Sequence, residues 1–251
     1  MSFKLAYLSP DGVELDLLDG SDGGPFVEFE TLSGFVGEFE DTVVQTPGVP
    51  GGRVDFRDRV VAQMSGAFTV VAPDRTAWRV VRDAFSSRRY GSLFLTIDGV
   101  QFWLPVRLRS SLPSPALRPG VGARVQVDLV SDGDGGGVWN FRSASEESEV
   151  VVSNWGDVPL WPEVVWAGAG GRVTLPSGVG FTLPAVVGEF RLPLARVHAG
   201  RVYNPDGVAD REVSRRVDAV SEMVPVGETR AYRVPSGARL QWDVGVFDPW
   251  H

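Results

Sequence analysis

Glycine and proline interrupt this chain so often that long helices have little room to form. The 251 residues include 30 glycines and 18 prolines, nearly a fifth of the total. Between them lie short apolar stretches, and in the second half these recur at a spacing of about ten residues, as in sandwiches of short strands. The sequence therefore predicts an all-β fold that is β-rich with one short α-helix.

The expected helix is Asp74 to Arg89. Its apolar residues recur at helical spacing and form one stripe: Ala77, Trp78, Val81, Ala84 and Phe85. Asp74 follows a proline and is suited to be the N-cap, and Gly91 supplies the stop. We expect the stripe to pack on a sheet.

Two hairpins are predicted in the first half. Phe3 to Leu8 and Val13 to Leu18 alternate on either side of Ser-Pro-Asp-Gly, which is a turn sequence. Leu93 to Leu108 contains the dipeptide Asp98-Gly99 between two apolar runs, which is a strong hairpin signal.

The segment from Leu32 to Arg53 predicts a long, partly extended arm. It contains repeated glycine and ends in Thr-Pro-Gly-Val-Pro-Gly-Gly. Its expected contact residues are apolar and lie between the glycines: Phe35, Phe39, Val43 and Val44. Such a segment is either a disordered loop or a belt that becomes ordered only on a neighbouring molecule.

A glycine-rich stretch, Ser131 to Gly137, supplies the expected domain boundary. Together with the polar residues 142–149 it divides the chain into 1–136 and 137–251. Asp132 and Asp134 do not make a calcium loop, because the later carboxylates of such a loop are missing. We interpret the stretch as a flexible linker.

The segment from Val150 to Gly171 predicts two strands joined by a rigid connector. Val150–Val152 is a β-branched run suited to a strand that is buried on both faces, and Val164–Trp166 is the second strand. In the connector Gly156 can take a positive φ, and prolines fix the backbone further on. The four expected turn residues are Asn154, Gly156, Pro159 and Pro162.

Charge is unevenly distributed, although the net charge is only −8. Residues 1–52 hold ten acids and one base, and residues 53–124 hold twelve arginines and five acids. The two segments could pair within the fold or between copies in an assembly. The alternative is that the charges only solvate the surface.

The sequence offers little support for catalysis, metals or cofactors. It has no cysteine, no Gly-x-Ser-x-Gly motif and only two histidines, His198 and His251, which are not spaced as a zinc site. No apolar run has the length of a signal peptide or a membrane span. We therefore expect a non-enzymatic protein without cofactor, made in a cytoplasm, and rank a hydrolase last.

The tryptophans of the second half leave a second function open. Three of them cluster in the connector and the strand after it: Trp155, Trp161 and Trp166. Exposed tryptophans on a β-sandwich can stack on sugar rings, whereas buried ones fill the core. A carbohydrate-binding module is thus the alternative to a structural protein.

The same connector carries a resemblance to a known family. Val152-Ser-Asn154-Trp-Gly156-Asp-Val-Pro159-Leu-Trp-Pro162-Glu-Val, followed by Trp166-Ala-Gly, resembles a signature in distal tail proteins of long-tailed bacteriophages. The stretch Val226 to Val244 and the later Asp-Pro-Trp are similar to the final strands of that family in phages of actinobacteria. The sequence departs at Trp155, which stands where proline often follows the asparagine.

The resemblance implies a virion protein of the tail tip or baseplate. Its N-terminal β domain would form a ring with the arm as a belt, and its C-terminal domain would be a galectin-like β-sandwich. The ring, a homohexamer, would join the tail tube to the tail hub and leave a channel through which DNA passes without specific binding. We expect no membrane partner. The connector around Asn154 would set the angle between the two domains.

Overall fold

The chain divides into two compact units. The computed structural model describes residues 2–18, 23–41, 43–45, 47, 50–54, 59–113, 122–133, 135–198 and 200–250. The first unit comprises Met1–Asn140 with Val246–His251, and the second comprises Phe141–Gly245. The sequence predicts a second domain of 137–251, which would include the residues after Gly245. They belong with the first because Phe247 and Trp250 pack there on Phe39 and Phe3.

The first unit is built from antiparallel strands. They are β1 (Phe3–Leu8), β2 (Glu14–Asp16), β3 (Phe26–Gly34), β4 (Phe39–Glu40), β5 (Val43–Gln45), β6 (Gly52–Val54), β7 (Val60–Val61), β8 (Met64–Ala72), β9 (Gly91–Ile97), β10 (Val100–Leu108), β11 (Ala123–Ser131) and the start of β12 (Trp139–Ser145).

Both predicted hairpins of this unit are confirmed. β1 pairs with β2, with Tyr7 opposite Leu15, and β9 pairs with β10 across Asp98 and Gly99, which both have positive φ. β10 then pairs at its end with β11, so that a second sheet runs in the order β10-β11-β8-β3.

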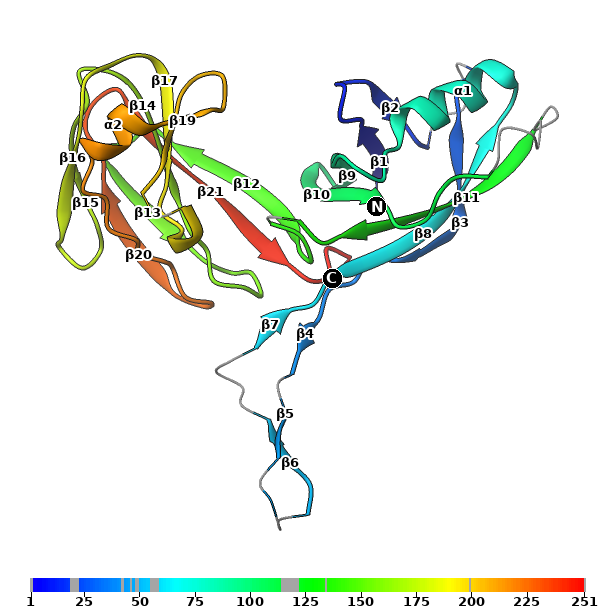
Figure 1. Ribbon diagram of the computed structural model, residues 1–251, viewed down its shortest axis with the longest axis horizontal. Helices are drawn as coiled ribbons and strands as arrows, with labels where there is room; N and C mark the ends of the chain where they lie inside the picture. The colour runs from blue at the N-terminus through cyan, green and yellow to red at the C-terminus, as the bar shows by residue number, and fades with distance from the viewer. Residues whose placement is uncertain are drawn as a thin grey trace. The chain divides into compact units, whose positions relative to one another are not determined.

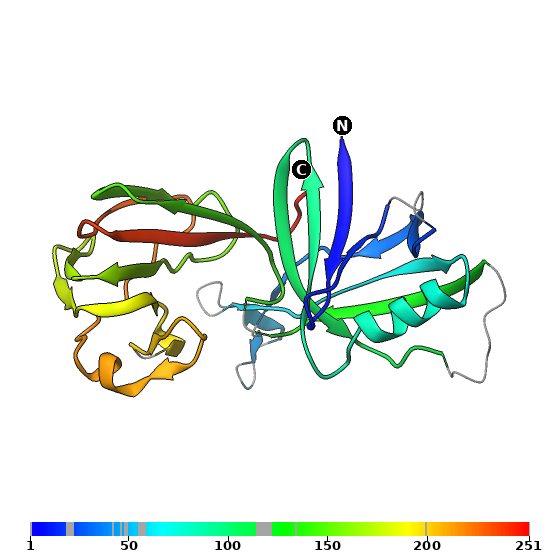
Figure 2. The ribbon, with the colours of Figure 1, turned by 90° about the horizontal axis from the view of Figure 1, so that it is seen from above.

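Helix α1 (Arg75–Ala84) covers one face of this second sheet, as Figure 2 shows. The Asp74 carboxylate accepts a hydrogen bond from the Ala77 N–H at 2.8 Å, which confirms the expected N-cap. The helix ends at Ala84, five residues before the predicted end. The reason is Phe85, which adopts an extended backbone and stacks its ring on Tyr7 at 4.2 Å.

The second unit is a two-sheet sandwich. Its further elements are β13 (Glu149–Ser153), β14 (Glu163–Gly168), β15 (Gly171–Thr174), β16 (Gly180–Leu183), β17 (Val186–Pro193), a 3-10 turn (Arg196–His198), β18 (Val202–Tyr203), β19 (Ala209–Asp210), α2 (Arg211–Arg215), β20 (Thr229–Arg233) and β21 (Ala238–Val246). One sheet has the order β19-β18-β17-β14-β21-β12 and the other the order β13-β20-β15-β16. Both contribute buried side chains to a single core, among them Val152, Trp166 and Tyr232.

The expectation that Val150–Val152 is buried on both faces is wrong. Val150 and Val152 are buried, whereas Val151 between them is 61% exposed. β13 is an edge strand with one face toward the core, so its side chains alternate between core and solvent. The strands on either side of the connector, β13 and β14, belong to different sheets.

Candidate assembly site

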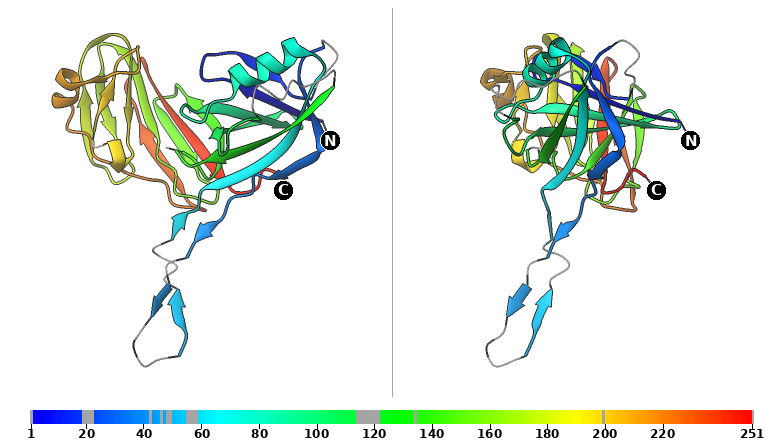
Figure 3. Two further views of the ribbon diagram at one scale, coloured as in Figure 1. Left: turned by 45° about the vertical axis from the view of Figure 1, so that its right-hand side comes forward. Right: turned by 90° about the vertical axis from the view of Figure 1, so that its right-hand side faces the viewer.

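A hairpin arm leaves the first unit between β3 and β8 (Figures 1 and 3). Phe39 and Glu40 of β4 pair with Val61 and Val60 of β7, and farther out β5 pairs with β6. We define the arm as residues 38–62, since the Ala62 N–H donates to the Glu38 carbonyl at its base. The arm therefore begins and ends later than the predicted segment Leu32–Arg53, whose first residues complete β3.

Phe35 is not an arm contact residue, contrary to the sequence-based expectation. It is 2% exposed and lies in the core beside Phe68 and Trp139, with ring centroids 6.2 and 6.3 Å away. Its φ of 58° is unusual for a residue with a side chain. This backbone conformation turns the ring inward just before the arm begins.

Gly66 leaves the space that the Phe35 ring occupies. A Cβ at Gly66 would lie 2.3 to 2.5 Å from atoms of that ring. We predict that Gly66→Ala lowers the free energy of unfolding of the first unit by about 1–3 kcal/mol, since the core would be overpacked. Gly24→Ala is the matched control in urea denaturation, because its Cβ would meet nothing within 4 Å. Equal stability of the two variants would contradict the prediction.

The root of the arm is held by residues from distant parts of the chain. The Gly37 N–H donates to the Phe247 carbonyl at 2.9 Å, and the Phe39 and Phe247 rings meet edge to face at 4.8 Å. The Trp139 indole N–H donates to the Phe35 carbonyl at 2.8 Å. At the end of the arm, a Cβ at Gly137 would lie 2.4 Å from the Ala62 carbonyl oxygen, so these two segments of the chain are in direct contact.

Beyond its root the arm exposes apolar side chains. Val43 on β5 is 53% exposed and Val60 on β7 is 60% exposed. Val44 also lies on β5, but its side chain is outside the described part of the chain. A two-stranded hairpin buries too little to be stable by itself, and its outer edges offer unpaired backbone groups. The arm is thus suited to be covered by another chain.

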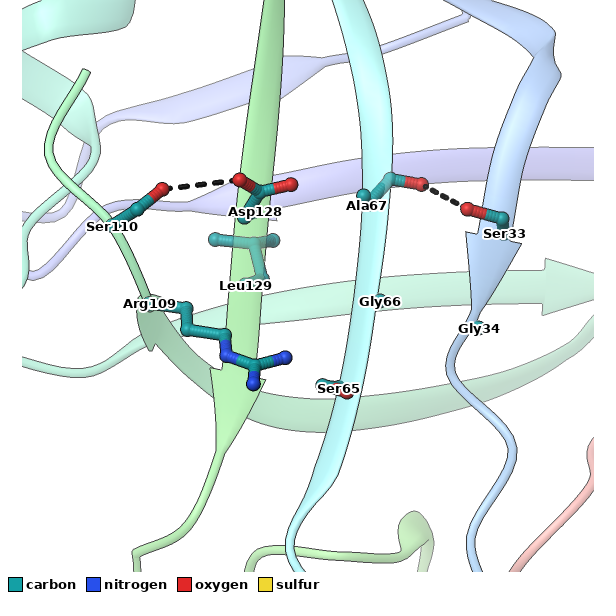
Figure 4. A pocket seen from close by; sticks show the side chains of 9 residues that line it. All are labelled: Ser33, Gly34, Ser65, Gly66, Ala67, Arg109, Ser110, Asp128 and Leu129. Carbon is teal, nitrogen blue, oxygen red and sulfur yellow. Dashed lines mark hydrogen bonds between the residues drawn. The ribbon is translucent and has the colours of Figure 1, made fainter.

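A polar hollow of about 550 Å³ lies beside the arm root on the same sheet (Figure 4). Its lining combines small residues of β3 and β8 with two residues of β11 and the two residues that follow β10. These are Ser33, Gly34, Ser65, Gly66, Ala67, Arg109, Ser110, Asp128 and Leu129. Ser110 donates to the Asp128 carboxylate at 3.1 Å. Within the described residues no carboxylate pairs with the Arg109 guanidinium. The hollow therefore offers hydrogen-bonding groups to a ligand or partner.

The glycine-rich stretch before β12 is tied down, contrary to its interpretation as a flexible linker. Arg107 donates to the Asp132 carboxylate through Nε at 3.0 Å and through a second guanidinium nitrogen, and the Tyr90 hydroxyl donates to it at 2.8 Å. The hydrogen bonds from Arg107 have the largest effect, and together with the bond from Tyr90 they hold the pKa of Asp132 below its ordinary value. Asp134 lies outside the described residues.

Asn154 organises the connector of the second unit. Its buried side-chain amide donates to the carbonyls of Val158 and Val224, both at 2.9 Å, and its Oδ1 accepts from the Gly156 N–H at 3.0 Å. Gly156 does not have the expected positive φ. Glycine is needed there for another reason, because a Cβ would lie 2.3 Å from the Gly245 carbonyl oxygen.

The two connector prolines differ in their surroundings. Pro162 is buried and its carbonyl accepts from the Leu194 N–H at 2.9 Å, whereas Pro159 is exposed. All these contacts lie within the second unit. That the connector sets an angle between the units stays a prediction.

The three tryptophans of this region have three different environments. Trp166 is buried in the sandwich core and donates its indole N–H to the Pro184 carbonyl at 3.0 Å. Trp161 is half-buried. Trp155 is 56% exposed and has Phe141 as a neighbour at 5.7 Å. Only Trp155 of these three offers a large part of its ring to a ligand or partner.

We predict that Asn154→Ala destabilises the second unit by about 1–3 kcal/mol, because the buried Gly156 N–H and Val158 carbonyl lose their partner. Urea denaturation followed by tryptophan fluorescence measures the change. Val151→Ala, an exposed position in the preceding strand, should be close to neutral. If Asn154→Ala lowers the free energy of unfolding no more than Val151→Ala does, the hydrogen bonds of Asn154 do not support the fold.

The structure adds few candidates for other chemistry. The described residues contain no group of three or more His, Asp or Glu side chains placed to hold a metal ion. His198 Nδ1 lies 3.0 Å from the Tyr203 hydroxyl, and His251 is outside the described residues. Among those residues, no helix has both the length and the apolar character that crossing a membrane requires.

Comparison with known proteins identifies the fold. No family model and no curated protein matches the sequence. Among solved structures, the chain is similar to the Dit protein (gp 19.1) of SPP1, described as a paradigm of the hub adsorption apparatus in phages that infect Gram-positive bacteria. The TM-score is 0.59 at 10% identity, covering 98% of this chain and 99% of that one.

Chains of the phage P2 baseplate in its activated conformation are similar as well. The TM-scores are 0.54 with Ca and 0.55 with Sr, each at 9% identity and covering 97% of this chain and 98% of the other. The likeness extends over both units. This chain therefore has the fold of a Dit-like distal tail protein.

Proposed function

We propose that this chain is a structural protein of a phage tail tip, a distal tail protein that assembles into a ring of six copies. The proposal assigns it a place in the virion between the tail tube and the tail hub. DNA would pass through the ring without specific binding. The first unit would form the ring and the second, interpreted as a galectin-like sandwich, would carry outward contacts.

The observation that carries the proposal is the arm. It is anchored firmly at its root, yet its outer part exposes Val43 and Val60, and among the described strands β5 and β6 pair only with each other. β3 also pairs with only one described strand, β8. Exposed apolar residues and open strand edges leave a monomer prone to edge-to-edge association. In a closed ring, neighbouring copies would cover them. The full-length likeness to SPP1 Dit supports the same assignment.

The oligomeric state of the purified protein tests the proposal. We expect rings in negative-stain electron microscopy and a mass near six chains by light scattering. Val43→Asp together with Val60→Asp should raise the concentration needed for assembly at least about tenfold, since charges would be buried at the contact. Val187→Asp, at a fully exposed position of the second unit, is the control. A wild-type protein that stays monomeric at high concentration contradicts the proposal.

The exposed Trp155 favours a second function, carbohydrate binding by the second unit. Aromatic rings at the surface can stack on sugar rings, and Asn154 holds this loop in a fixed shape. In this case a glycan array should show binding that Trp155→Ala lowers at least about tenfold. Absence of binding by the wild-type protein would exclude it for the glycans tested.

A further inference from the structure

The two strands that cross between the units both reach the arm root. β12 begins in the first unit with Trp139, whose indole holds the Phe35 carbonyl directly before the arm. β21 ends at Val246, where the chain re-enters the first unit and Phe247 meets Gly37 and Phe39. We call residues 246–250 the strap. The connections to the second unit are thus also the supports of the arm.

The strap is fixed at both ends. At one end Phe247 accepts the Gly37 N–H, and the fit is so close that a Cβ on Gly37 would lie 2.4 Å from the Phe247 ring. At the other end the Trp250 ring stacks on Phe3 of β1 at 5.3 Å, and the backbone N–H of Trp250 donates to the Asp248 carboxylate. The strap therefore ties the arm root to the body of the first unit.

The arm depends on this support more than an ordinary hairpin does. Its inner pair of strands, β4 and β7, is only two residues long on each side. So short a pair forms few hydrogen bonds, and local opening has a low free energy unless apolar packing opposes it. Phe39 provides that packing, and Phe247 is its aromatic partner.

We propose that the strap is a conformational device by which the second unit controls the arm. While β21 holds Phe247 against Gly37 and Phe39, the arm root is ordered and competent for assembly. A partner or load that pulls on β21 and separates Phe247 from Gly37 and Phe39 releases the root. The role of the released arm rests on the proposed ring function, whereas the coupling itself does not.

Hydrogen exchange of the full chain tests the clamp. Phe247→Ala should raise the exchange rates of the Gly37 and Ala62 amides at least about tenfold, whereas Phe247→Leu, which keeps apolar bulk, should retain much of the protection. Unchanged exchange of the β8 and β11 amides, which belong to the same unit as Phe247, would show that Phe247→Ala still folds. Root amides that stay protected in Phe247→Ala would overturn the clamp.

An insertion tests the coupling to the second unit. Gly-Ser-Gly-Ser between Gly245 and Val246 keeps Phe247 in the chain but slackens its connection to the second unit. We expect faster exchange at Gly37 and weaker ring assembly. The same insertion between Asp206 and Gly207, an exposed turn of the second unit, should change neither. If the first insertion leaves Gly37 protected, the coupling is wrong. If wild-type protein forms no ring but the exchange results hold, the ring function fails and the coupling stands.

Discussion

The contact between Gly37 and Phe247 is the constraint on which the arm depends. A backbone hydrogen bond and an aromatic pair bring the re-entering chain onto the base of a hairpin that buries little by itself. The hairpin can extend from the first unit because its first residues are fixed on three sides. Phe35 is buried beneath it, Trp139 holds the Phe35 carbonyl, and Gly137 closes against Ala62.

Glycine permits these close approaches. Gly37, Gly66 and Gly137 each lie where a Cβ would be within 2.6 Å of another residue. The same principle recurs in the second unit, where Gly156 touches the Gly245 carbonyl. The high glycine content thus does more than supply turns. At these positions it lets chain segments contact each other directly, which rigidifies the arm root and the connector.

Local signals made much of the fold predictable. The Ser-Pro-Asp-Gly and Asp98-Gly99 turns predicted two hairpins, and the apolar stripe with its Asp74 N-cap predicted α1, since such features depend on neighbouring residues. The contacts of Phe35, Trp139 and Phe247 were missed, because they join residues far apart in sequence. The early end of α1 has the same cause, as Phe85 leaves the helix to reach Tyr7. The alternating aromatic residues Phe35 and Phe39 around Gly37 were the available sequence signal for the arm root. Their spacing alone does not show that the Phe35 ring enters the core.

The position of Phe247 also determines when the arm can become ordered during synthesis. About 210 residues separate Gly37 from its partner, so the ribosome completes the hairpin long before the segment that clamps it. A nascent chain therefore displays an unclamped arm until the sandwich has been made. In the proposed ring, this order of synthesis would keep incomplete chains out of the assembly, because they lack the ordered arm root that a neighbour would recognise.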